Sequence, residues 1–228
     1  MRDKREAIVD YSSLVYDKGW VANHEGNLST RISANAYLAT PTSFSKRDIE
    51  ERDLIVVDEQ GALIRGFRKP FSEFALHRVV YQNRPDVGAV IHAHPPYSTA
   101  LSVVGRGIER PLLCEQVVSI GPTVPLVPFA IPKTDFFTES LIPFLEKFDV
   151  LILENHGVVA FGVDLEQAFL RLEYCESIAK IYHLASPLGA LRYLSWTEIQ
   201  PLLDSRKKAG LGPESRGLSR DQAYGYLK

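Results

Sequence analysis

Cysteine is scarce in this chain: Cys114 and Cys175 are the only two among 228 residues. A secreted domain held together by disulfides would need a larger framework of cysteines, so the sequence predicts a protein of the reducing cytoplasm. Both cysteines lie within apolar stretches, and we expect buried, unreactive thiols rather than redox groups.

Other features are missing as well. No window approaches the run of about 20 apolar residues that crosses a bilayer, and the charged start at residues 1–6 lacks the apolar segment of a secretory signal. The net charge is only −2, which gives no electrostatic reason to expect nucleic acid as a partner. No G-x-G-x-x-G pattern stands at a strand-to-helix turn, so a nucleotide cofactor is unsupported.

What is present fits one α/β domain with a sizeable core, since 45% of the residues are hydrophobic and 24% charged. Periodicity and turn residues predict strands at 27–33, 36–40, 53–58, 62–65, 87–92, 123–129, 150–153 and 158–161. The predicted helices are 8–20, 72–83, 97–104, 136–148, 164–185 and 196–208. Because these elements show no regular βαβ alternation, we expect a central, mostly antiparallel β-sheet flanked by helices.

The domain boundary is placed by composition. Residues 1–208 are predicted to form the domain, and residues 209–228 a C-terminal tail. Residues 210–220 are rich in Gly, Pro, Ser and charge, which predicts a loose segment or one ordered by a partner subunit.

The clearest chemical signal is the pair His92 and His94 at the end of an apolar strand, followed by Pro95. Residues i and i+2 of a strand point to the same face, so the two imidazoles can converge on one point. His156 follows a second buried strand, in a turn that Gly157 permits. Three neutral imidazoles are typical of a catalytic zinc site that keeps one position open, although ligand type alone leaves copper, iron, nickel or cobalt possible.

Glu73 lies where the helix at 72–83 begins. Ser72 is predicted to be the N-cap, which would place Glu73 in the first turn. A carboxylate there is favoured by the helix dipole alone, and it can equally face a metal and move protons. By contrast, His77 on the same helix has no pairing of this kind and is predicted to be structural.

Six short motifs occur in order across about residues 5–208: 26–29 (GNLS), 40–43 (TPTS), 72–73 (SE), 84–86 (RPD), 92–94 (HAH) and 155–157 (NHG). This ordered set resembles the class II aldolase/adducin family, which includes sugar-phosphate aldolases and 4-epimerases. The resemblance implies the mostly antiparallel α/β fold and a four-fold tetramer with its active sites at subunit interfaces. It also implies that His92, His94 and His156 bind the metal, with Glu73 as the acid/base.

The same resemblance points to a substrate tail held by loops. Asn27, Thr42 and Ser72 keep the polar character of the family's phosphate loops, whereas Ser43 replaces a usual glycine and Phe71 replaces a serine. The loops still form a plausible anion-binding rim with the helix start. An anionic tail is therefore favoured over an apolar one.

The second acid/base is open at this point. Glu115 falls close to a position where family enzymes place a catalytic group that can act across a subunit boundary. Its alternative is plain surface exposure. The family aldolase also has a tyrosine about where Ala209 stands, and Tyr224 or Tyr226 from the tail are candidates to replace it.

The resemblance implies a metal-dependent lyase, an aldolase on a small ketose or hydroxyketone that passes through an enediolate. A 4-epimerase, a decarboxylase and a dehydratase reach related intermediates, although family epimerases usually carry Asp where Glu73 stands. A non-catalytic adducin-like interaction module is the hypothesis from another class, but such modules lack the three histidines. A purely structural zinc site is disfavoured, because such sites usually include cysteine ligands.

Overall fold

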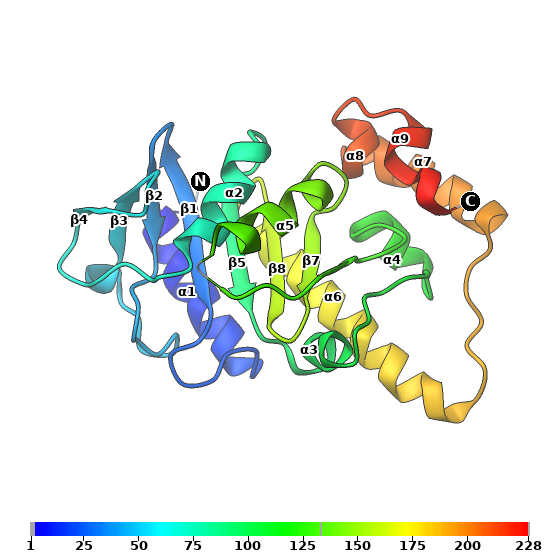
Figure 1. Ribbon diagram of the computed structural model, residues 1–228, viewed down its shortest axis with the longest axis horizontal. Coiled ribbons are helices and arrows are strands. Elements are labelled where there is room, and N and C mark those ends of the chain that lie inside the picture. Colours follow the sequence, from blue (N-terminus) through cyan, green and yellow to red (C-terminus); the bar gives the residue numbers. More distant parts are fainter. Residues whose placement is uncertain (1–2, 133, 228) are drawn as a thin grey trace.

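The structure is a computed structural model that describes residues 3–132 and 134–227. Its strands are β1 (Asn27–Ser33), β2 (Ala36–Ala39), β3 (Ile55–Asp58), β4 (Leu63–Arg65), β5 (Ala89–Ala93), β6 (Leu126–Val127), β7 (Val150–Leu153) and β8 (Gly157–Gly162). They form one sheet in the order β4-β3-β2-β1-β5-β8-β7-β6. Figure 1 shows this order from β4 at the left to β7 near the centre. Every pairing is antiparallel except β6 with β7, so the predicted sheet class is confirmed.

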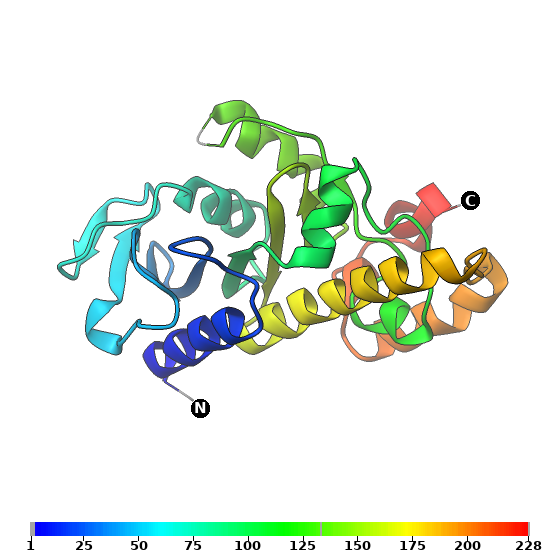
Figure 2. The same cartoon turned by 90° about the horizontal axis from the view of Figure 1, so that it is seen from below.

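Helices cover both faces of this sheet. The helices are α1 (Lys4–Asp17), α2 (Phe74–Asn83), α3 (Pro96–Val103), α4 (Cys114–Ser119), α5 (Asp135–Leu145), α6 (Leu165–Ala185), α7 (Trp196–Lys208), α8 (Gly212–Ser215) and α9 (Arg220–Tyr224). One buried apolar cluster joins the sheet to α1, α3 and α6, and a second joins its other face to α2 and α5. Figures 1 and 2 together show these layers, with α2 and α5 on one side and α1 and α6 on the other.

Because both faces are covered, β5 at the centre of the sheet is buried along its whole length. Ile91 packs into the cluster on the α6 side, and Val90 into the cluster on the α2 side. Side chains alternate between the faces, so His92 points to the same side as Val90, toward α2 and α5. This alternation decides where the functional groups meet.

The C-terminal residues differ from the expected loose segment. Residues 212–227 form α8, α9 and a short 3-10 turn. Ala223 and Tyr224 of α9 are buried against α4 and α7, in a third apolar cluster with Val117, Ile199 and Leu203. The richness of 210–220 in Gly, Pro, Ser and charge suggested looseness, but Ala223 and Tyr224, with Leu218 and Leu227 packed beside them, dock this segment. The predicted boundary at 208, and any contribution of the tail to a neighbouring active site, stay predictions.

Three smaller differences concern local structure. Helix α4 lies where no helix was predicted, because a six-residue segment is too short to show helical periodicity. Cys114 at its start is exposed, so the expectation that both cysteines are buried is wrong for this one. Cys175 is buried, and burial raises the pKa of its thiol to about 12. Within the described residues, no helix combines the length and apolar content needed to cross a bilayer.

Candidate metal centre

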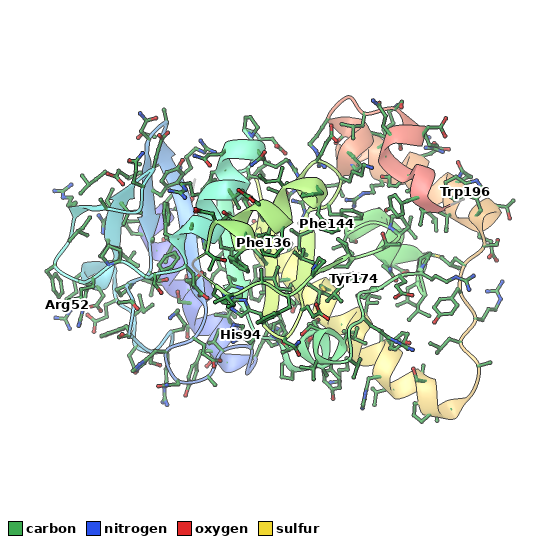
Figure 3. All side chains as sticks on the ribbon, in the orientation of Figure 1. Arg52, His94, Phe136, Phe144, Tyr174 and Trp196 are labelled. Atoms are coloured by element: carbon green, nitrogen blue, oxygen red, sulfur yellow. The ribbon has the colours of Figure 1, made fainter. Side chains whose placement is uncertain are left out.

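The three predicted histidines meet at one end of the central strands. His92 in β5 pairs with Asn27 of β1 on one side and with Val159 of β8 on the other. His94 follows the end of β5, and His156 lies in the turn between β7 and β8. Figure 3 labels His94 near the lower ends of β5 and β8. The sheet order therefore brings together residues that are more than 60 positions apart in the sequence.

Their rings form a tight triangle. The ring centroids lie 5.0 Å apart for His92 and His94, 4.7 Å for His92 and His156, and 5.4 Å for His94 and His156. One nitrogen from each ring lies within 4.8 Å of the other two. The Nε2 atoms of His92 and His94 are 3.2 Å apart. The convergence predicted from the alternation of β5 is present in the structure.

Hydrogen bonds orient two of the rings. Nδ1 of His92 lies 3.0 Å from the carbonyl oxygen of Val158, and Nδ1 of His94 lies 3.0 Å from Oε2 of Glu25. Both partners are acceptors, so each Nδ1 carries the proton and each Nε2 presents a lone pair. Burial lowers the pKa of His92 well below its ordinary value, which keeps that ring neutral. Partners of this kind fix the tautomer and raise the basicity of metal-binding histidines.

His156 is held by an unusual turn. Asn155 before it has a φ of 53°, in the left-handed region. A Cβ added at Gly157 would approach Cδ2 of His94 to 2.4 Å and the carbonyl oxygen of Ala93 to 2.6 Å. Only glycine fits there, so the turn lets the β7–β8 connection close against His94.

Glu73 completes the cluster from the start of α2. Its Oε1 lies 3.3 Å from Nε2 of His156, and its Oε2 lies 3.9 Å from Nε2 of His92. The predicted cap at Ser72 is wrong: Glu73 itself occupies the N-cap position and makes no side-chain cap hydrogen bond. Its carboxylate is therefore free to turn toward the histidines.

The carboxylate of Glu73 is held ionised. Burial alone would raise its pKa, but hydrogen bonds from His156 and from Asn27, together with the neighbouring rings, outweigh burial and hold the pKa well below its ordinary range. The ionised carboxylate and the imidazole nitrogens around it together form a donor set of the kind that binds a cation.

A divalent ion fits these residues. The Nε2 atoms of His92 and His94 lie 3.2 Å apart, a spacing that suits two neighbouring ligands of one ion. In addition, Nδ1 of His156 is buried without a hydrogen-bond partner in the described part of the chain. Imidazole donors suit zinc and related transition metals.

A cavity of about 240 Å³ opens beside the cluster. It is lined by His24, Glu25, Gly26, Asn27, Pro41, Thr42, Phe71, Ser72, Glu73 and His94. Three of the predicted substrate-binding residues, Asn27, Thr42 and Ser72, thus lie on its wall. Ser43 is exposed, has a φ of 53° and does not line the cavity.

The candidates for a second acid/base lie elsewhere in this chain. Glu115 is exposed on α4, near enough to Tyr174 of α6 to contribute to raising the pKa of that phenol. Tyr224 is buried in the C-terminal cluster, and the hydroxyl of Tyr226 lies 2.9 Å from Oγ1 of Thr123. None of these three lines the cavity described above.

Sequence reasoning did not foresee two groups at the site. Glu25, which orients His94, precedes a glycine in a loop and has no pattern that marks it. His77 was predicted to be structural, yet its Nε2 lies 2.6 Å from Oδ1 of Asn27. The signal that could have found His77 is its place four residues after Glu73, one helical turn along the same face.

Comparisons with known proteins agree with this geometry. Residues 6–183 match the family described as Class II Aldolase and Adducin N-terminal domain. The L-fuculose phosphate aldolase of Methanococcus vannielii is 35% identical over 171 residues, which cover 75% of this chain and 91% of that protein. The 3-oxo-tetronate 4-phosphate decarboxylase of Haemophilus influenzae is 31% identical over 204 residues, covering 87% and 95%.

A solved structure is similar over nearly the whole chain. An L-fuculose 1-phosphate aldolase superposes with a TM-score of 0.82 at 27% identity, covering 91% of this chain and 97% of that one. The similarity thus extends to the arrangement of strands that brings the three histidines together.

Proposed function

The chain belongs to the class II aldolase and adducin family, and from that premise we propose that it is a zinc-dependent lyase. In this proposal it cleaves a small ketose or hydroxyketone with an anionic, phosphate-bearing tail by a retro-aldol reaction. His92, His94 and His156 hold the ion, and Glu73 is the acid/base. The observation that carries the proposal is the convergence of three imidazoles and an ionised carboxylate beside an open cavity.

A bound divalent ion supplies Lewis-acid stabilisation of the negative charge that develops on the substrate oxygens during cleavage. The protein's own groups manage the protons. Cleavage of the carbon–carbon bond releases an aldehyde and leaves an enediolate, whose carbon must then be protonated. Glu73 lies at the cavity wall and is ionised at the start, so it would take up the hydroxyl proton that is lost as the aldehyde forms and then pass it to this carbon. It would do so through Oε1, because its Oε2 is held by the Asn27 side-chain amide at 3.0 Å.

The tail of the substrate binds at the polar rim in this proposal. Thr42, Ser72 and Asn27 line the cavity, and Ser43 contributes from the neighbouring exposed loop. Phe71 is buried and packs edge-on against the ring of His77, so it adds no donor to this rim. Hydroxyl and amide donors are the groups that bind phosphate without a fixed charge.

We extend the proposal to a homotetramer with active sites at its interfaces. Phe137 of α5 contacts the ring of His156, and its neighbour Phe136 is 65% exposed, as are Ile131 at 66% and Phe129 at 53%. Exposed apolar residues this close to a site mark a protein interface more often than free surface. Glu115, Tyr224 or Tyr226 of an adjacent subunit would then supply the second acid/base. Both cysteines are unpaired, which fits a cytoplasmic location.

A decarboxylase acting on a 3-oxo acid is the second candidate, since the relative from Haemophilus influenzae bears that name. Loss of carbon dioxide also leaves an enolate, so the same ion and the same Glu73 would serve. A 4-epimerase and a dehydratase use related intermediates and remain further alternatives within the same chemistry.

The test is a substrate panel on the purified protein, first chelated and then reloaded with zinc or other divalent metals. We expect ketose 1-phosphates to release dihydroxyacetone phosphate and an aldehyde only after metal is restored. His92→Ala should lose both bound metal and activity. Release of carbon dioxide from 3-oxo acids without any aldehyde would contradict the aldolase assignment and support the decarboxylase. A folded protein that binds far less than one metal per chain would instead support the non-catalytic module.

A further inference from the structure

A chain of hydrogen bonds continues from Glu73 into the core. Nδ2 of Asn27 donates to Oε2 of Glu73 at 3.0 Å. Oδ1 of the same amide lies 2.6 Å from Nε2 of His77. Nδ1 of His77 in turn lies 2.7 Å from Oγ of Ser29. Asn27 and Ser29 lie two residues apart on β1, so both point at α2, which carries His77.

The direction of each hydrogen bond follows from the first. A carboxylate can only accept, so the amide of Asn27 must present Nδ2 to Glu73 and Oδ1 to His77. Because Oδ1 can also only accept, Nε2 of His77 must carry a proton. The ring is neutral, since burial lowers the pKa of His77 to about 3. Its Nδ1 therefore has a lone pair and accepts from the hydroxyl of Ser29.

Among residues 3–132 and 134–227, the ring of His77 has no hydrogen-bond partner other than Asn27 and Ser29. The side chain is fully buried, and its ring packs against Phe71 and Phe74 at centroid distances of 5.1 and 6.3 Å. An apolar side chain would suit these aromatic neighbours better, because burying an imidazole costs free energy unless both nitrogens are satisfied. The two hydrogen bonds to β1 are what this position gains from a histidine.

We propose that His77 is a positioning residue, which locks the Asn27 amide by donation from Nε2 to Oδ1 so that Nδ2 holds Oε2 of Glu73. Glu73 is thereby fixed with Oε1 toward His156. The proposal rests on the proposed function only in assigning proton transfer to Glu73. The hydrogen-bond relay itself is a property of the protein with or without substrate.

The first test determines the tautomer of His77 and does not depend on enzyme activity. We expect the two-bond proton–nitrogen spectrum of protein labelled with [15N]histidine to show His77 as the neutral Nε2–H tautomer, at pH 7 and in metal-free protein. The signal is assigned by its absence from the His77→Gln variant. An Nδ1–H tautomer would mean that the Asn27 amide is reversed, with Oδ1 against Glu73, and would overturn the proposal.

The second test separates positioning from packing. His77→Phe keeps an aromatic ring but removes the donor, and kcat should fall about 10-fold or more at unchanged metal content, with KM within about two-fold. His77→Gln, whose amide can reach Oδ1 of Asn27, should recover a large part of the rate. Tyr81→Phe is the matched control on the same helix as His77. It removes a buried hydroxyl that forms hydrogen bonds with Ser29 of β1, and we expect nearly wild-type rates.

A double-mutant comparison completes the design. If His77 acts through Asn27, His77→Phe should cost no further rate in an Asn27→Ala background. Equal losses in both backgrounds would assign His77 a different role and defeat the proposal. Absence of lyase activity in the wild-type protein would refute the proposed function alone, because the tautomer measurement would still decide the relay.

Discussion

The fold holds two ionised carboxylates in opposite surroundings, Glu73 with 22% of its side chain exposed and Asp149 with none. Glu73 stands among neutral imidazoles and an amide beside a cavity. Asp149, which directly precedes β7, is fully buried among four arginines. In both cases burial would raise the pKa of the carboxyl group, and the neighbouring groups outweigh it and hold the pKa low.

The partners of Asp149 come from four separate places in the fold. They are Arg84 after α2 at 2.9 Å, Arg171 of α6 at 3.2 Å, Arg206 of α7 at 3.2 Å and Arg216 after α8 at 3.2 Å. Their other hydrogens bond mostly to backbone carbonyls, such as those of Leu145, Phe161 and Val118. Asp149 thus joins α7 and the segment after α8 to α6 and to the end of α2.

The difference teaches how to separate structural from functional polarity. Around Asp149 the chain supplies the cations, and no cavity is needed. Around Glu73 the chain supplies imidazole and amide groups, with no arginine or lysine among its partners in the described residues, and leaves open space. A lowered pKa does not distinguish Glu73 from Asp149, because both carboxyl groups have one. The charge of the neighbouring side chains does distinguish them.

Asp149→Asn should give the largest effect. It leaves four arginines without their shared anion, so we expect a loss of about 3–5 kcal/mol in the free energy of unfolding. Urea denaturation of metal-free protein measures it. Because the folded pKa is depressed, the stability that Asp149 contributes is present above its unfolded pKa of about 3.9 and is lost as the pH falls below it. Asp86→Asn, at a partly exposed partner of Arg84, is the control and should cost about 1 kcal/mol or less.

Glu73→Gln should show the opposite profile. We expect metal content to stay and the unfolding free energy to change little, while kcat falls on the order of 100-fold or more, as for the loss of a positioned general base. Steady-state rates and metal analysis on the same preparation decide this. A large loss of stability with normal turnover would show that Glu73, like Asp149, has a structural role.

Lys46 is a buried basic group that lacks a partner of opposite charge in the described part of the chain. It is 1% exposed, its Nζ donates to the carbonyl oxygen of Phe44, and it forms no ion pair within the described residues. Burial lowers its pKa to about 8. Between the folded pKa of about 8 and the unfolded pKa of about 10.4, Lys46 binds more protons in the unfolded chain than in the folded one. The free energy of unfolding should therefore rise by about 2 kcal/mol from pH 7 to pH 10 through this residue.

Lys46→Met should lack that rise. Unfolding titrations at several pH values compare the two proteins, and parallel curves would show that Lys46 keeps an ordinary pKa in the folded state.

Arg216→Ala should give the smallest effect. This arginine is the most exposed of the four, with 17% of its side chain accessible, and Asp149 keeps three other partners. We expect a loss of about 1 kcal/mol. A loss as large as that of Asp149→Asn would show that the four arginines act as one unit rather than in graded fashion.

The sequence predicted the histidines and the buried strands before them well, because apolar runs and the spacing of His92 and His94 are local signals. The strand predicted at 123–129 is only Leu126–Val127 in the structure, because the flanking Pro125 and Pro128 cannot donate to a strand ladder. The N-cap at Glu73 rather than Ser72 could not be predicted, because serine is a preferred capping residue and glutamate is not. Lys46 and the partners of Asp149 gave no local signal, because their contacts join distant segments: Arg84 and Asp149, for example, are 65 residues apart. The docked C-terminal helices depend likewise on a few long-range apolar contacts.

The turn at residues 155–157 limits how this protein can be re-engineered. Asn155 needs a left-handed backbone, and Gly157 has no room for a side chain against His94. Directed-evolution libraries aimed at new substrates should therefore keep this tripeptide constant and diversify the cavity wall at His24, Thr42 and Phe71 instead. Variation would then reach the bound molecule without disturbing the ligand geometry on which every variant depends.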